Sequence, residues 1–90
     1  MEITKTLKIE NDLGLHARAA AKIVALTEHF QSNLFFRKDD REVDGSSILS
    51  ILTLACPRGA EIRVRAVGED SAELMEALCR LFQDKFGEEK

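Results

Sequence analysis

The segment from Gly14 to Arg18 holds the residue types best suited to chemistry, because it places a histidine where a turn becomes the first turn of a helix. The first backbone N–H groups of a helix lack intrahelical partners and carry the positive end of the helix dipole. An anion is therefore expected beside His16, met by the backbone N–H groups of Ala17 and Arg18. The guanidinium of Arg18 adds a positive charge two residues away.

The chemistry that fits this arrangement is phosphoryl transfer through His16. A neutral imidazole is nucleophilic near neutral pH, and a nitrogen–phosphorus bond is labile enough to pass its phosphoryl group on. A histidine near a helix start can also be a simple surface or capping residue. The pattern alone leaves both interpretations open.

The composition favours one small domain, spanning residues 1–90, over a two-domain protein. Ninety residues, 44% of them hydrophobic, suffice for a single core. The formal net charge is −3 and the basic residues are scattered among acids, which disfavours a nucleic-acid-binding protein. The longest nearly unbroken apolar stretch, residues 48–56, is far shorter than the ~20 residues that span a bilayer, so we expect no membrane insertion.

The cysteines and histidines indicate neither a disulfide framework nor a metal centre. Cys56 and Cys79 lack C-x-x-C spacing, and the N-terminal residues do not resemble a secretory leader, so a reducing cytoplasm is the expected location. Two histidines and two unclustered cysteines give no recognised zinc spacing. We expect no metal and no cofactor.

The hydrophobic periodicity predicts strands and helices in the order β-α-β-β-α-β-α. Strands are expected at 3–9, 34–37, 42–43 and 61–67, and helices at 17–30, 48–54 and 70–86. Asp70 and Glu73 resemble a capping box at the start of the last helix. Residues 87–90 are expected to be a frayed tail. This order packs most simply as an α+β open-faced sandwich, in which three helices cover one face of a four-stranded antiparallel sheet.

Two motifs resemble those of the HPr family. The residues Gly14-Leu15-His16-Ala17-Arg18-Ala19-Ala20 are similar to the family's active-site signature, G-[LIM]-H-x-R-P-A. Ser47-Ile48-Leu49, followed by Leu52 and by residues 59–62, resembles the family's regulatory-serine helix and the strand after it. The likeness covers nearly the whole chain. One position departs from the signature, since Ala19 stands where the family has proline.

The resemblance implies a phosphocarrier protein of the phosphoenolpyruvate phosphotransferase system, acting in sugar transport or regulation. His16 would accept the phosphoryl group through Nδ1, and Arg18 would steady it. The implied donor is enzyme I and the implied acceptor is an EIIA-type protein. Such a carrier is a co-substrate of enzymes and not itself an enzyme. We expect a monomer. The choice between the sugar-transport branch and the nitrogen-related NPr branch stays open.

Ser47 has both a structural and a regulatory interpretation. A serine at a helix start accepts a hydrogen bond from a first-turn N–H group, and Ser46 is a rival for this role. The resemblance also implies Ser47 as a regulatory phosphorylation site, for which an HPr kinase/phosphorylase would be a further partner. A binding module controlled by Ser47, without phosphoryl transfer, is the alternative function. Ile48, Leu49 and Leu52 are the expected docking patch.

Overall fold

A single four-stranded antiparallel sheet forms one layer of the molecule. The computed structural model describes all 90 residues. The strands are β1 (Glu2–Lys8), β2 (Asn33–Lys38), β3 (Arg41–Asp44) and β4 (Glu61–Val67). They lie in the order β1-β4-β2-β3, so that β4 pairs with both β1 and β2. Val64 of β4 lies opposite Lys5 on one side and Phe36 on the other.

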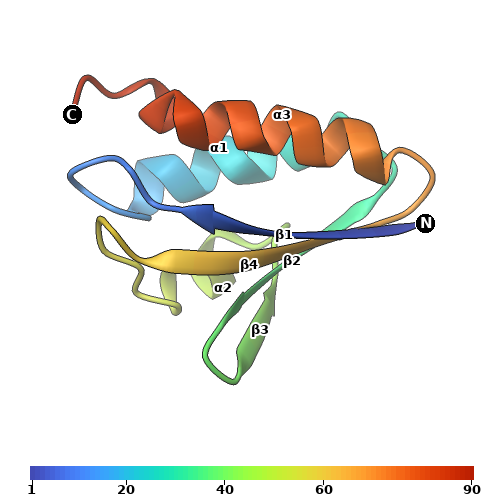
Figure 1. Cartoon of the computed structure of the whole chain (residues 1–90), viewed down its shortest axis with the longest axis horizontal. Helices are drawn as coiled ribbons and strands as arrows, with labels where there is room; N and C mark the ends of the chain where they lie inside the picture. The colour runs from blue at the N-terminus through green and yellow to red at the C-terminus, as the bar shows by residue number, and fades with distance from the viewer.

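The helices form the second layer and confirm the predicted open-faced sandwich. They are α1 (Ala17–Thr27), α2 (Ile48–Leu52) and α3 (Ser71–Gln83), followed by a short 3-10 turn at Lys85–Gly87. The long helices α1 and α3 lie along the sheet, and the C-terminus ends near the loop that joins β1 to α1 (Figure 1). The short helix α2 contacts α1 and the edge strand β3.

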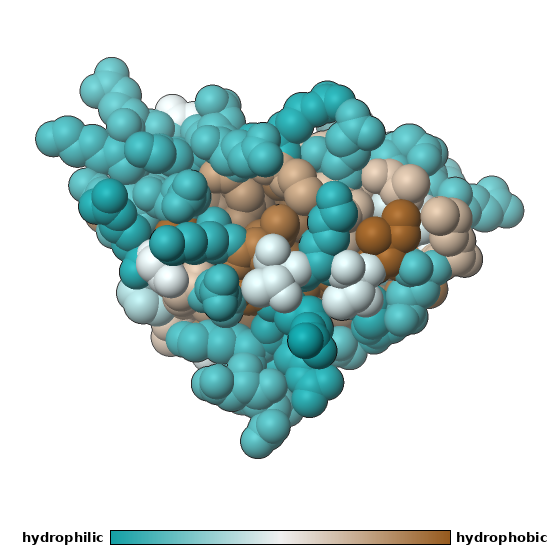
Figure 2. All heavy atoms as spheres, viewed as in Figure 1, coloured by the Kyte–Doolittle hydropathy of each residue, from teal (hydrophilic) through white to brown (hydrophobic).

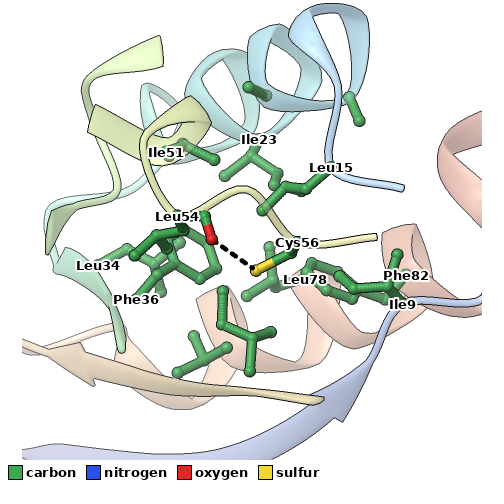
Figure 3. Close-up of a cluster of buried hydrophobic side chains, with 14 of the residues drawn as sticks. Ile9, Leu15, Ile23, Leu34, Phe36, Ile51, Leu54, Cys56, Leu78 and Phe82 are labelled. Atoms are coloured by element: carbon green, nitrogen blue, oxygen red, sulfur yellow. Dashed lines mark hydrogen bonds between the residues drawn. The ribbon is translucent and has the colours of Figure 1, made fainter. Parts of the chain in front are cut away.

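The core lies between the two layers and is a single cluster of 18 buried residues. In β4 the buried residues Ile62, Val64 and Ala66 alternate with more exposed ones, as the period of two predicts. Figure 3 shows side chains from α1, α2, α3 and the sheet meeting in this cluster, with Cys56 among them. Burial raises the pKa of the Cys56 thiol, which disfavours the reactive thiolate.

The helices end earlier than their periodicity predicts. The first ends at Thr27 rather than at residue 30, and α2 ends at Leu52 rather than 54. The last ends at Gln83, because Lys85, Phe86 and Gly87 have positive φ angles of 54°, 56° and 80°. Left-handed backbone reverses the chain direction and stops an α-helix.

Asp70 precedes α3, but the predicted capping box is wrong. The carboxylate of Asp70 makes no cap hydrogen bond. It accepts hydrogen bonds from the backbone N–H groups of Gln31 (2.9 Å) and Ser32 (2.8 Å) and from the Ser32 hydroxyl (2.5 Å). Asp70 therefore fastens the loop between α1 and β2 to the start of α3.

Hydrophilic side chains cover most of the face seen in Figure 2, and hydrophobic atoms show mainly between the helical layer and the sheet. No helix combines the length and the apolar composition needed to cross a bilayer.

Candidate functional site

A tight turn at Gly14 sets the position of His16. Gly14 has φ +68°, and a Cβ placed there would lie 2.5 Å from the carbonyl oxygen of Cys56. The next residue, Leu15, donates its backbone N–H to that same oxygen at 2.8 Å and buries its side chain in the core. A side chain at position 14 would therefore clash with Cys56 and displace the loop from the hydrogen bond between Leu15 and Cys56. The glycine lets the chain pass close to Cys56 and then enter α1.

His16 occupies the position that caps the N-terminus of α1, with extended backbone angles. Its carbonyl oxygen accepts the hydrogen bond from Ala20 N–H at 2.9 Å, while its side chain makes no cap hydrogen bond. The backbone N–H groups of Ala17 and Arg18 have no hydrogen-bond partner. The geometry thus brings the imidazole and two free N–H donors together, as the sequence predicts.

The imidazole of His16 is held through one of its two ring nitrogens. Its Nε2 atom lies 2.5 Å from Oε2 of Glu88, a residue 72 positions away in the sequence. Nδ1 makes no hydrogen bond, and the side chain is 23% exposed. Since the carboxylate can only accept, Nε2 carries the proton in this contact. Nδ1 is then the nitrogen with a free lone pair.

Glu88 is held in place from three directions. The Asn11 side-chain amide donates from Nδ2 to Oε1 of Glu88 at 3.0 Å, and Arg18 lies with a guanidinium nitrogen 4.0 Å from Oε2. Burial opposes ionisation of Glu88, but the hydrogen bonds from His16 and Asn11 and the charges of His16 and Arg18 outweigh it and lower the pKa of this carboxyl group. Glu88 therefore meets His16 as a carboxylate.

The sequence predicts a frayed tail at residues 87–90, and in the structure these residues contact the loop between β1 and α1. Besides the contacts of Glu88, the backbone N–H of Asp12 donates to the carbonyl oxygen of Lys90 at 3.0 Å. The tail turns back over the loop between β1 and α1, and Figure 1 shows the C-terminus at that end of the molecule. Together with Asp12 and Leu13, the residues Arg18, Lys22 and 87–90 line an open recess.

Ser47 caps α2, as one of the two sequence interpretations predicts. Its hydroxyl accepts a hydrogen bond from Ser50 N–H at 3.2 Å. The rival, Ser46, instead donates both its hydroxyl and its backbone N–H to Asp44, each at 2.8 Å. The residue after Ser47 is Ile48, so the hydroxyl lies at the edge of the expected docking patch.

The three residues of the expected docking patch differ in exposure. Leu49 is 76% exposed and Ile48 is 37% exposed, whereas Leu52 is half-buried and packs against the core. Leu13, which is 63% exposed, lies in the turn before His16 and was not predicted as a site residue. The sequence does carry a signal for Leu13, because it is an apolar residue in an otherwise polar turn, three residues before His16. No group of three or more His, Cys, Asp and Glu side chains could hold a metal ion.

Comparisons with known proteins agree with the resemblance seen in the sequence. A family model described as "PTS HPr component phosphorylation site" matches residues 3–84. The chain is 46% identical over 83 residues to the phosphocarrier protein HPr of Xylella fastidiosa strain Temecula1, which covers 92% of this chain and 93% of that protein. It is 33% identical over 90 residues to the phosphocarrier protein NPr of Escherichia coli K12, covering 99% of this chain and 100% of that protein.

A solved structure also matches along nearly its full length. The crystal structure of HPr-C-His from Thermoanaerobacter tengcongensis superposes with a TM-score of 0.92 at 38% identity, covering 98% of this chain and 99% of that one. The match of sequence and fold extends over the turn, the histidine and the helix that form the site. This chain therefore belongs to the HPr family of phosphocarrier proteins.

Proposed function

We propose that the protein carries a phosphoryl group on Nδ1 of His16, received from an enzyme I that uses phosphoenolpyruvate and passed to an EIIA-type acceptor. One observation carries this assignment to His16. The imidazole stands at the N-terminus of α1 with Nε2 engaged and Nδ1 free. Membership of a phosphocarrier family supports the same role. The partners are those that the family implies.

The surroundings of His16 suit a phosphoryl group. The unpartnered N–H groups of Ala17 and Arg18 can donate to its oxygens, and the helix dipole favours its negative charge. The side chain of Arg18 is 63% exposed, which leaves the guanidinium free to turn toward the phosphate. A planar guanidinium can bind two phosphate oxygens at once.

The transfer step forms a bond between Nδ1 and phosphorus with the lone pair of the imidazole. The bond between phosphorus and the donor breaks, and its electron pair leaves with the donor. The reverse process discharges the group onto the acceptor. Because enzyme I and the acceptor supply the rest of each site, the carrier acts as a co-substrate of enzymes and not as an enzyme.

The exposed apolar residues near the site suit docking of these partners. Leu13 lies in the turn before His16, and Ile48 and Leu49 lie on α2, which packs against α1. Exposed apolar side chains of this kind favour contact with another protein. Leu52 takes a smaller part because it is already half-buried. We place the carrier in the cytoplasm. We also propose that it is a monomer, and gel filtration would test this oligomeric state.

Regulation through Ser47 is a second proposal for the same protein. The Ser47 hydroxyl precedes the exposed residues Ile48 and Leu49 directly, so a phosphate there would lie at the edge of the docking surface. An HPr kinase/phosphorylase would be the partner that adds and removes it. The alternative function is a binding module controlled by Ser47 phosphorylation that transfers no phosphoryl group through His16. The labelling experiment below distinguishes this alternative from the carrier.

Labelling tests the assignment of His16. The protein is incubated with labelled phosphoenolpyruvate and its cognate enzyme I, and the label is tested for loss in acid and persistence in base. His16→Ala should take up no label. His29→Ala, which removes the only other histidine, should label like the wild type. Equal labelling of His16→Ala and the wild type would contradict the proposal.

A further inference from the structure

We propose that Glu88 is a positioning residue for phosphoryl transfer, which holds the His16 ring with its proton on Nε2 so that the Nδ1 lone pair faces the donor. This inference rests on the proposed function. Its central observation is the 2.5 Å contact between Nε2 of His16 and Oε2 of Glu88. A carboxylate that accepts the proton of one ring nitrogen fixes both the tautomer and the orientation of an imidazole.

The carboxylate of Glu88 is itself oriented by Asn11, a buried residue of the loop between β1 and α1. Asn11 is fully buried, and its Nδ2 donates both to Gly14 O at 2.8 Å and to Oε1 of Glu88 at 3.0 Å. Both partners are acceptors, so the amide has only one orientation that satisfies them. Asn11 therefore ties the position of Glu88 to the same turn that sets the position of His16.

The tail that carries Glu88 is anchored by Phe86. Phe86 is 1% exposed, and its ring centroid lies 4.9 Å from that of Phe82. The backbone carbonyl oxygen of Phe86 accepts a hydrogen bond from Lys22. Lys85 and Phe86 both have positive φ, which L-residues adopt at a cost. Burial of the Phe86 ring offsets this cost. The turn then delivers Glu88 to the histidine, with the side chain of Glu88 only 12% exposed.

The charges also favour transfer. When Nδ1 bonds to phosphorus, the ring keeps its Nε2 proton and gains a positive charge, which the carboxylate of Glu88 stabilises. The bonds of the two ring nitrogens point apart, so the carboxylate and the phosphoryl group lie on different sides of the ring. Arg18, 4.0 Å from Oε2, lies within reach of both anions.

The first test detects the ring proton in the absence of any partner. In protein labelled with ¹⁵N-histidine, His16 should show a slowly exchanging, low-field Nε2–H proton. Exposed His29 serves as the internal reference without such a signal. Glu88→Ala should lose the signal, and Glu88→Gln should keep a weaker one, because the amide oxygen still accepts. A wild-type His16 that resembles His29 would overturn the proposal.

The second test measures single-turnover transfer from phosphorylated enzyme I. Loss of a charge-assisted hydrogen bond predicts a rate for Glu88→Ala that is lower by about 10- to 100-fold, with Glu88→Gln in between. Glu89→Gln, at an exposed neighbouring residue, should match the wild type. A Glu88→Ala rate equal to or above that of the wild type would overturn the positioning role, whereas a wild type that accepts no label would overturn the proposed function itself.

Discussion

Replacing Arg18 should separate transfer from folding more cleanly than any other change at the site. The Arg18 side chain is 63% exposed, and its one ion pair, to Glu88, is 4.0 Å long. Because the Arg18 end of this pair is exposed and the separation is long, we expect it to contribute about as little as a surface pair, about 0–1 kcal/mol. Arg18→Ala should therefore lower the free energy of unfolding by no more than about 1 kcal/mol, which corresponds to a fall in Tm of at most about 4–8 °C for a domain of this size.

The effect of the same change on transfer should be much larger. A donor aimed at charge that develops in the transition state contributes about 100- to 1000-fold to the rate. Arg18→Lys should recover part of this loss, because it restores the charge without the two-pronged geometry. Arg80→Ala removes the same charge from an exposed site on α3 and is the matched control.

Rapid-quench transfer from phosphorylated enzyme I, beside thermal melting of each variant, measures both quantities for Arg18. A wild-type rate in Arg18→Ala would remove the guanidinium from the site. An equal loss in Arg80→Ala would show that net charge, and not position, governs the rate.

Four further substitutions test local features of the fold and of the docking surface. Ala19→Pro should raise Tm by roughly 2–8 °C, because the Ala19 N–H has no partner and proline restricts the unfolded chain; a lower Tm would mean that the ring does not fit this buried position. Ser47→Ala should cost about 1 kcal/mol by removing the cap on Ser50 N–H. Ser47→Asp should keep that stability yet bind enzyme I more weakly by calorimetry, and equal affinity would place Ser47 outside the interface. The hydrogen bond from the Ser32 hydroxyl and those from the backbone N–H groups lower the pKa of Asp70. Its contribution to stability should thus be complete above about pH 4 and decline as the pH falls through the lowered folded pKa; acid melting curves of Asp70→Asn with an unchanged pH dependence would contradict this.

The sequence predicts those parts of the fold that local patterns determine. In β4 the alternation of Ile62, Val64 and Ala66 gives both the bounds and the buried face correctly. The cap at Ser47 is likewise local, since its partner lies three residues away. The helix ends are less well predicted. The end of α3 depends on left-handed angles at Lys85 and Phe86, residues whose types do not favour that conformation.

Asp70 shows why a correct local signal can still give a wrong contact. A carboxylate before a helix suits a cap, and Asp70 does precede α3. Its oxygens, however, accept from Gln31 and Ser32, which lie 38 or 39 residues earlier in the chain. A competing set of donors supplied by tertiary structure cannot be inferred from the spacing of Asp70 and Glu73.

The contact between His16 and Glu88 is the clearest example of a tertiary contact that local sequence patterns do not predict. The turn, the histidine and Arg18 follow one another within a few residues, so their spacing indicates that they lie together. Glu88 lies in a short charged tail with no periodicity, and such a tail fails to order unless something anchors it. Phe86 supplies the anchor by entering the core, and Asn11 supplies the hydrogen bond that orients the carboxylate. The site that we propose to accept a phosphoryl group thus already holds an anion, the carboxylate of Glu88. Both can be present because Glu88 contacts Nε2, whereas Nδ1 and the N-terminus of α1 remain free for the phosphoryl group.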